Sequence, residues 1–161
     1  MCIRDSLTPG LRFFHQGQRE GKRVRIPTQL RRGPDETPDA AIAAFYDGLL
    51  ACLKDPAFRD GQWQLLDVRP AWEGNGSSNA FVTFSWTGPG DLRRLVAVNY
   101  AFHQSQCYVV LPWGDLAGRT WRLHDRLGEA IYDRDGANLS TRGLYLDMRA
   151  WGYHVFEVRP V

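Results

Sequence analysis

The stretch that decides the fold runs from residue 80 to residue 100 and reads Ala80-Phe-Val-Thr-Phe-Ser-Trp-Thr-Gly-Pro-Gly-Asp-Leu-Arg-Arg-Leu-Val-Ala-Val-Asn-Tyr100. Two runs rich in β-branched and aromatic residues, 80–86 and 95–100, flank the segment Gly88-Pro-Gly-Asp91. Glycine at such a place supplies a positive φ, and the apolar residues on either side recur with a period of two. The stretch therefore predicts a β-hairpin.

Similar short runs occur on both sides of this hairpin, separated by turn residues such as Asp135-Gly136. We expect strands at residues 63–69, 80–86, 95–100, 107–111, 120–124, 144–147 and 153–158. Together they predict a mainly β fold over residues 61–161, an antiparallel β-sandwich of about seven or eight strands.

The composition indicates a packed protein and excludes several classes of partner. Hydrophobic residues make up 43% of the 161 residues, charged residues make up 24%, and the net charge is only +2. Acidic and basic residues are interspersed along the chain, so neither nucleic acid nor a membrane is an expected partner. The cysteines and histidines show no metal-ligand spacing, so we expect neither a metal nor a cofactor. Three widely spaced cysteines favour free thiols and, with no visible signal peptide, a cytoplasmic location.

The N-terminal part reads differently from the rest. Residues 10–17, bounded by two glycines, predict a short strand that leads into a basic loop. Apolar residues at helical spacing then predict an amphipathic helix from Pro38 to Lys54, with Thr37 as its N-cap and Asp55-Pro56 as its stop. Residues 1–6, Met-Cys-Ile-Arg-Asp-Ser, resemble translated adapter sequence, so they have no part in the expected fold.

The order of strand, loop, helix and many strands resembles the C-terminal end of an alpha-amylase-family glycoside hydrolase. Leu7-Thr-Pro-Gly-Leu-Arg-Phe-Phe-His-Gln-Gly-Gln-Arg-Glu-Gly21 is similar to the last barrel strand of that family, with glycines at the start and seven residues later. The helix 38–54 resembles the final barrel helix. The runs 94–100 and 144–157 resemble central and terminal strands of the family's C-terminal sandwich. The resemblance implies that residues 7–60 end a (β/α)₈ TIM barrel and that residues 61–161 form a separate domain.

The same resemblance implies a function and places the catalytic residues elsewhere. Members of the family cleave or transfer α-glucosidic bonds by a retaining mechanism, with an aspartate nucleophile and a glutamic acid proton donor. Those residues would lie on barrel strands before Leu7, so the chain is expected to contain no catalytic residue and to be inactive alone. The substrate, an α-glucan or α-glucoside, would bind through the missing barrel, on which this chain would pack within one molecule.

Two groups of residues are candidates for substrate binding. The loop after the expected barrel strand would line the cleft, and its mixed donors and acceptors suit sugar hydroxyls. Its members are His15, Gln16, Gln18, Arg19 and Glu20. The family pattern has an acidic residue where Arg19 stands, with Glu20 one position later. These residues could equally be polar loop residues that orient the connector.

Trp72, in a loop-like segment, could stack on a sugar ring or pack against the barrel. His124 and His154 lie in expected strands and are interpreted as ordinary residues of the sandwich. A noncatalytic carbohydrate-binding or interdomain-packing module is the alternative function, and a purely structural sandwich is a third. The sequence of the upstream reading frame would decide among them.

Overall fold

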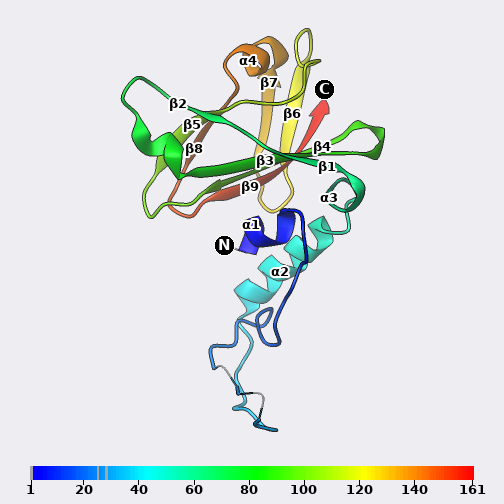
Figure 1. Cartoon of the computed structure of the whole chain (residues 1–161), viewed down its shortest axis with the longest axis vertical. Helices are drawn as coiled ribbons and strands as arrows, with labels where there is room; N and C mark the ends of the chain where they lie inside the picture. The colour runs from blue at the N-terminus through cyan, green and yellow to red at the C-terminus, as the bar shows by residue number, and fades with distance from the viewer. Residues whose placement is uncertain (1, 25, 28) are drawn as a thin grey trace.

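The structure is a computed structural model that describes residues 2–24, 26–27 and 29–161. Two antiparallel sheets form a sandwich, and the N-terminal helices lie beneath the larger sheet (Figure 1). The elements in chain order are α1 (Cys2–Leu7), α2 (Ala40–Cys52), α3 (Pro56–Asp60), β1 (Gln62–Leu65), β2 (Val68–Pro70), η1 (Gly76–Ala80), β3 (Phe81–Gly88), η2 (Pro89–Asp91), β4 (Leu92–Asn99), β5 (Ser105–Val109), β6 (Thr120–Asp125), β7 (Ile131–Asp135), α4 (Gly136–Thr141), β8 (Leu144–Met148) and β9 (Tyr153–Pro160).

The two sheets differ in size and share one core. The larger has the strand order β1-β3-β4-β9-β6-β7, and the smaller has the order β2-β5-β8. Apolar side chains from the two facing surfaces, among them Leu95, Cys107, Trp121 and Phe156, form the core between the sheets. The expected antiparallel β-sandwich is therefore confirmed.

The hairpin at residues 80–100 is present as predicted. β3 and β4 pair in register from Phe81 with Asn99 to Gly88 with Leu92. The turn between them places both Gly90 and Asp91 at positive φ, 68° and 60°. The three residues between the last pair, 89–91, form a tight hairpin loop, and glycine adopts positive φ there at no steric cost.

Three details of the sheets differ from the sequence prediction. The run 63–69 forms two strands rather than one, because the chain crosses from the larger to the smaller sheet between β1 and β2. β7 was not expected, because its residues Ile-Tyr-Asp-Arg-Asp are mostly exposed at a sheet edge and show no apolar alternation. Asp135-Gly136 begins helix α4 instead of forming a turn, since the Asp135 carboxylate accepts the Asn138 N–H at 2.9 Å.

Helices α1, α2 and α3 cover the outer face of the larger sheet and form a second core with it. Leu49 of α2, Phe58 of α3, and Val96 and Val98 of β4 belong to this cluster. Trp86 adds a polar link, because its indole N–H donates to the Leu7 carbonyl at 2.8 Å across 79 residues of sequence. The central strands are consequently apolar on both faces, which explains why 92–99 is an almost uninterrupted buried run.

The first residues have a place in the fold that the sequence did not predict. Residues 2–7 form α1, and Ile3 and Leu7 are buried in the second core. Apolar side chains at positions three and seven lie on one face of a helix, and this face meets the sheet. Treating residues 1–6 as outside the fold is therefore incorrect for 2–6 in this structure, while residue 1 lies outside the described residues.

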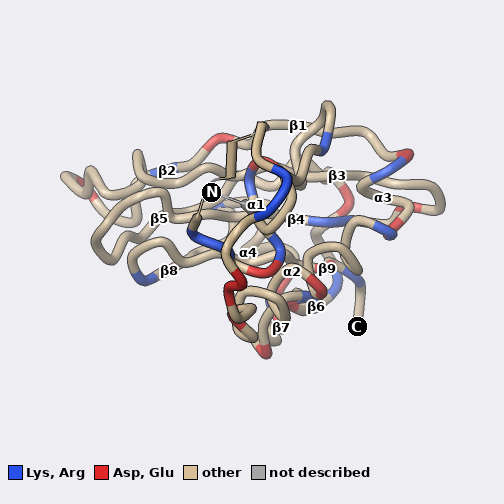
Figure 2. Tube along the Cα trace, turned by 90° about the horizontal axis from the view of Figure 1, so that it is seen from below, with Lys and Arg blue, Asp and Glu red and all other residues tan. Residues whose placement is uncertain are grey.

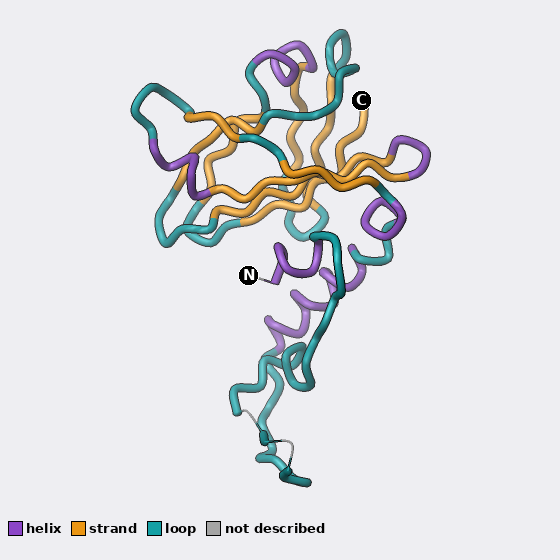
Figure 3. Tube along the Cα trace, in the orientation of Figure 1, coloured by secondary structure: helices purple, strands orange, loops and turns teal. Residues whose placement is uncertain are grey.

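The expected strand at residues 10–17 is wrong. Residues 11–15 have no regular secondary structure, and residues 16–21 form turns, as the loop in Figure 3 shows. A strand is stable only when a neighbour pairs with its backbone groups, and no described segment of this chain pairs with these residues. Gly10 and Gly17 both have positive φ, 120° and 83°, which is consistent with turns rather than with a strand.

The long helix is confirmed with different ends. α2 begins at Ala40, two residues later than expected, because Asp39 rather than Thr37 is the N-cap. The Asp39 carboxylate accepts the N–H groups of Ala41 and Ile42 at 3.0 and 3.1 Å. Only Tyr46, Leu49 and Cys52 are fully buried on this helix, and Ile42 remains exposed.

Lysine, arginine, aspartate and glutamate are mixed over the surface (Figure 2). Neither sign dominates one side of the molecule in that view. Across the described residues, no helix combines the length and the apolar character needed to cross a bilayer.

Candidate functional site

The predicted cleft loop, residues 15–20, packs against the middle of α2. Gln18 donates to the Tyr46 hydroxyl at 2.7 Å, and its side-chain oxygen accepts the His15 N–H. Arg19 forms an ion pair with Asp47 at 2.6 Å. Two of the five candidate residues, Gln18 and Arg19, thus form bonds that hold the loop on the helix.

The other candidates of the loop make fewer contacts. The Glu20 carbonyl accepts the Asp39 N–H at 2.9 Å, and the His15 imidazole lies 3.1 Å from the Gln16 carbonyl. The loop lies away from the two pockets described below, and none of its residues lines either of them. A role of this loop in substrate binding therefore stays a prediction. Trp72 is 56% exposed in the segment between β2 and η1.

A pocket of about 440 Å³ opens where the turn between β6 and β7 meets the ends of β8 and β9. Polar groups of both signs line it, together with a tyrosine and apolar side chains. The polar and aromatic lining residues are Asp125, Glu129, Asp147, Arg149, Tyr153 and His154. A second pocket of about 420 Å³ lies beside α3, with Arg12, Trp63 and Trp86 in its wall.

Asp125 and His154 form a buried pair in the wall of the first pocket. The two side chains are 4% and 20% exposed, and 2.7 Å separates Asp125 Oδ2 from His154 Nδ1. The other carboxylate oxygen accepts the N–H groups of Leu127 and Val155, each at 3.1 Å. The His154 ring also stacks on Phe156, with ring centroids 4.7 Å apart.

The carboxylate of Asp125 determines which ring nitrogen of His154 carries a proton. Burial opposes ionisation of Asp125, but the hydrogen bonds from His154 and from the two backbone N–H groups outweigh it and lower the pKa of the carboxyl. An ionised carboxylate only accepts hydrogen bonds, so the proton at the short contact belongs to His154 Nδ1. When the ring is neutral, Nε2 is then an acceptor on a residue that lines the pocket.

The turn between β6 and β7 is shaped around this carboxylate. A Cβ atom at Gly128 would lie 2.8 Å from Asp125 Oδ2, closer than such contacts allow. A larger residue there would displace either the turn or the carboxylate. Gly128 thereby keeps Asp125 in reach of His154.

The turn Arg149–Gly152 separates this pocket from an exposed aromatic pair. Arg149 and Gly152 line the pocket, whereas Trp151 is 57% exposed. The Trp151 ring meets Tyr100 with centroids 5.7 Å apart and an interplanar angle of 86°. Trp151 has φ +56°, which is a strained conformation for a bulky residue.

Asn99 locks the two loops that carry these rings. It is completely buried, and its amide nitrogen lies 2.8 to 3.1 Å from the carbonyl oxygens of His103, Met148 and Arg149. Its side-chain oxygen accepts the Ala101 N–H at 3.2 Å. Because one buried amide joins both loops, the positions of Tyr100 and Trp151 depend on each other.

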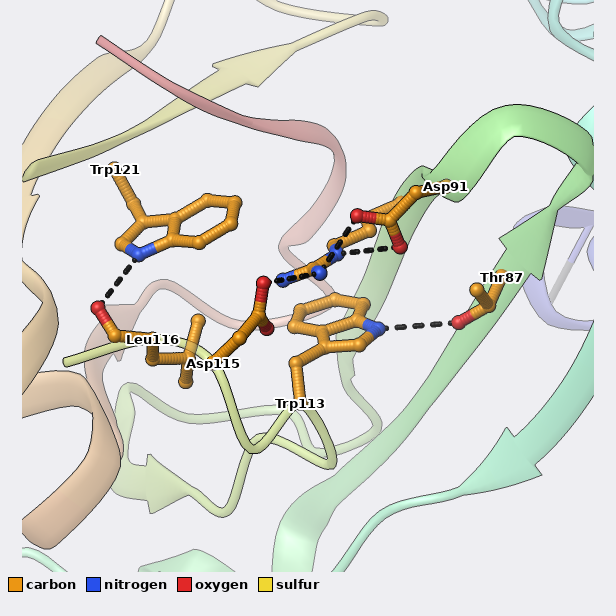
Figure 4. Close-up of polar contacts among 7 residues, drawn as sticks. Thr87, Asp91, Trp113, Asp115, Leu116 and Trp121 are labelled. Carbon is orange, nitrogen blue, oxygen red and sulfur yellow. Dashed lines mark hydrogen bonds and ion pairs between the residues drawn. The ribbon is translucent and has the colours of Figure 1, made fainter. Parts of the chain in front are cut away.

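At the opposite end of β4, Arg93 is the centre of a polar cluster (Figure 4). Its guanidinium binds Asp91 through two nitrogens at 3.0 and 2.7 Å, and Asp115 at 2.8 Å. It also lies over the rings of Trp113 and Trp121, 5.3 and 4.7 Å from their centroids. The Trp113 N–H donates to Thr87, and the Trp121 N–H donates to the Leu116 carbonyl. These bonds are internal, so we interpret the cluster as a clamp between the β3–β4 hairpin and the loop 111–119.

The sequence analysis missed the pocket and its pair. His154 was interpreted as an ordinary residue of the sandwich, and Asp125 was not singled out. The two are 29 residues apart, and they meet only because β6 pairs with β9. The signal that could have found Trp151 is its place just before Gly152, between two predicted strands. In the described part of the chain, no group of three acidic, histidine or cysteine residues is arranged to hold a metal.

Fold and site together define a two-sheet antiparallel β-sandwich with helices on the outer face of its larger sheet. Among solved structures, a noncanonic maltogenic alpha-amylase, AmyB from Thermotoga neapolitana, is similar to 99% of this chain with a TM-score of 0.71 and 10% identity. The chain spans 35% of the length of that protein. This confirms the expected likeness to the alpha-amylase family at the level of the fold.

Other solved structures are similar over less of the chain. A complex of MutB with isomaltulose gives a TM-score of 0.46 at 18% identity, and covers 73% of this chain and 18% of its own. A trehalulose synthase MutB structure gives 0.43 at 17% identity, with the same coverage. These likenesses are too distant to support an argument. No protein-family model matches the chain, and no curated protein matches it in sequence.

Proposed function

We propose that this chain is the C-terminal part of an alpha-amylase-family enzyme that hydrolyses or transfers α-glucosidic bonds. The supporting observation is the extent of the likeness to the maltogenic alpha-amylase, which covers 99% of the chain. A sandwich of about 100 residues is a common architecture that serves many functions. The shared region here includes the N-terminal helices and loop as well as the sandwich, and this combination is far less general.

The surface of the N-terminal segment supports a role in packing against a larger body. Leu11 and Phe13 are strongly exposed, and Ile42 of α2 is exposed as well. Such side chains on the segment that precedes the sandwich suit contact with a barrel that lies earlier in the parent protein.

We also propose that the chain carries no catalytic carboxylate. Retaining glycosidases hold a nucleophile and an acid about 5–5.5 Å apart and open to the substrate. Asp125, the buried carboxylate of the pocket, is instead engaged by His154 and by two backbone N–H groups. The α-glucan or α-glucoside would bind through the barrel of the parent.

The test is to recover the upstream reading frame and to express the parent beside the 161-residue chain. The parent should act on maltooligosaccharides, and the chain alone should show no turnover. An unrelated domain upstream would overturn the family assignment. Turnover by the chain alone that is lost in Glu20→Gln or Asp35→Asn would overturn the absence of a catalytic group.

A further inference from the structure

Strand β1 forms one open edge of the larger sheet. Among the described strands it pairs only with β3, and it lies on the opposite side of the molecule from β7, the other edge strand of this sheet (Figure 2). All residues of β1 are exposed. No described segment of the chain pairs with the outer side of this strand. The backbone groups on that side are therefore available to another strand.

The register of β1 shows which residues present these free backbone groups. The Leu66 N–H donates to the Thr83 carbonyl at 2.9 Å, in the same register as the β1–β3 pairing. Along an antiparallel strand, residues that bond to one neighbour alternate with residues whose N–H and C=O groups point the other way. Gln64, two residues before Leu66, therefore also bonds towards β3. The N–H and C=O groups of Trp63 and Leu65 point out of the sheet.

The other edge strands carry protection that β1 lacks. β7 reads Ile-Tyr-Asp-Arg-Asp, β2 reads Val-Arg-Pro and β8 reads Leu-Tyr-Leu-Asp-Met. Charged residues and proline on an edge strand hinder the addition of a further strand. β1 reads Gln-Trp-Gln-Leu and contains neither. Of the edges in the described part of the chain, β1 is therefore the one most open to pairing.

The side chains of Trp63 and Leu65 add an apolar surface to this edge. They stand opposite Trp86 and Phe84 of β3, which belong to the core beneath the larger sheet. Opposite residues of an antiparallel pair lie on the same face, so Trp63 and Leu65 are on the face that the helices cover. They are nevertheless 36% and 61% exposed. The 420 Å³ pocket reaches this edge, with Phe58, Trp63 and Trp86 in its wall.

A second copy of β1 fits this edge in a particular register. A twofold axis between two antiparallel strands of one sheet is perpendicular to the sheet, so opposite residues share a face. With the axis at Gln64, Trp63 of each copy lies opposite Leu65 of the other, and their outward N–H and C=O groups bond to each other. An axis at Trp63 would also require the Gly61 N–H, which already donates to the Ala57 carbonyl at 3.2 Å.

The side chains in this register are complementary to those of a second copy. Each Trp63 meets the second copy's Leu65, beside the apolar wall of the pocket, and aromatic–aliphatic pairs across strands are stabilising. On the other face, the two Gln64 side chains lie opposite each other. A primary amide both donates and accepts hydrogen bonds, so the two can bond to each other. β1 contributes no ionised group, so pairing buries no unpaired charge on this strand.

We propose that β1 is a self-association site, at which two copies of this chain join their larger sheets into one continuous antiparallel sheet. The strand is only 4 residues long, so the contact is smaller than the roughly 800 Å² per partner of a stable interface. The dimer therefore forms reversibly and at high protein concentration. The proposal uses only the open edge of the sandwich and does not depend on the proposed enzymatic function.

The experiment combines sedimentation velocity with amide hydrogen exchange by NMR, on the whole 161-residue chain from micromolar to millimolar concentration. The average mass should rise from that of a monomer towards that of a dimer. Exchange of the Trp63 and Leu65 amides should slow as the concentration rises, because their N–H groups enter the new pairing. Exchange of the Gln64 amide should not change, because this N–H already bonds to β3.

Two variants of Leu65 test the edge directly. Leu65→Pro removes an outward N–H without removing a bond to β3, and proline is tolerated on the open side of an edge strand. Leu65→Lys places a charge beside the second copy's Trp63. Each should raise the dissociation constant of the dimer at least tenfold and leave the melting temperature of the monomer unchanged. Ile131→Lys is the matched control, since Ile131 is 55% exposed on the opposite edge strand, and it should associate like the wild type.

A second control separates this contact from the exposed apolar residues of the N-terminal loop. Leu11 is 92% exposed there, and Leu11→Lys should also associate like the wild type. A monomer at every concentration, or wild-type association of Leu65→Lys, would overturn the proposal. Association that is lost in Leu11→Lys but kept in both Leu65 variants would place the contact on the N-terminal loop and would also overturn it. Slow exchange of the Trp63 and Leu65 amides at every concentration would mean that the same chain covers this edge, which would exclude a second copy.

Discussion

The replacement of Val98 by aspartate tests the core beneath the larger sheet. Val98 is 4% exposed in β4, opposite Val82 of β3 and Tyr153 of β9. A carboxyl group there has no partner, so it takes up a proton instead of remaining charged in an apolar site. Holding that proton at pH 7, about three units above the ordinary pKa of aspartate, costs about 4 kcal/mol.

The loss of buried apolar carbon adds to this cost. Removing two buried methyl groups costs about 1.6 kcal/mol, which brings the total near 6 kcal/mol. Natural domains are stable by only about 5–15 kcal/mol, so Val98→Asp should be largely unfolded or close to it at pH 7. Val98→Ala, which lacks the carboxyl, should lose only about 2 kcal/mol.

Urea unfolding followed by circular dichroism measures these differences, and pH supplies an internal check. The introduced carboxyl has a raised pKa in the folded state, so its penalty grows above the unfolded pKa and shrinks towards pH 4. Leu65→Asp is the control, because Leu65 is 61% exposed on edge strand β1, and its stability should change by less than about 0.5 kcal/mol. A Val98→Asp protein within about 1 kcal/mol of the wild type at pH 7 would refute the placement of this core.

Three further predictions concern an ion pair, a titration and the N-terminal loop. Asp55 pairs with Arg94 at 2.7 Å in a buried site, so Asp55→Ala should lower the free energy of unfolding by about 3 kcal/mol or more. In the same urea assay, Asp60→Ala, which removes the exposed pair with Arg59, should cause no measurable change. The pKa of Asp125 is lowered in the folded state, so its contribution to stability is present above about pH 4 and is lost as the pH falls through the folded pKa. Asp125→Asn should therefore weaken the dependence of the urea midpoint on acidic pH. An unchanged dependence would contradict this prediction. Amides of the described residues in 8–38 should exchange hydrogen far faster than those of β4, and the chain should bind a hydrophobic dye. Equal protection in both segments, without dye binding, would contradict the exposed apolar surface on this segment.

Local patterns in the sequence predicted most of the sandwich, and the failures have physical causes. The hairpin at 80–100 could be predicted because its turn residues stand between two runs rich in β-branched and aromatic residues. β7 could not, because an edge strand needs no apolar alternation. The strand expected at residues 10–17 failed for another reason. Its composition suits a strand, but strand formation depends on a partner for its backbone, which is not a local property.

The candidate site was less accessible to sequence reasoning than the fold. The pair of Asp125 and His154 depends on the register between β6 and β9, which no local pattern specifies. The strain at Trp151 is visible only in its backbone angle. The loop at residues 15–20 was a candidate because of the resemblance to the alpha-amylase family. In the structure, the side chains of Gln18 and Arg19 bond to α2. Its role in substrate binding remains a prediction.

The position of β9 has a consequence for how the protein is made. Residues 153–160 lie in the middle of the larger sheet, between β4 and β6, although they come after every other strand in the chain. While a ribosome synthesises the chain, the two halves of this sheet, β1-β3-β4 and β6-β7, cannot join until these residues have left the exit tunnel. Pairings between distant segments form slowly, and unfinished sheets expose edges that attract other nascent chains. Chaperone supply during the interval before β9 pairs should therefore influence the soluble yield.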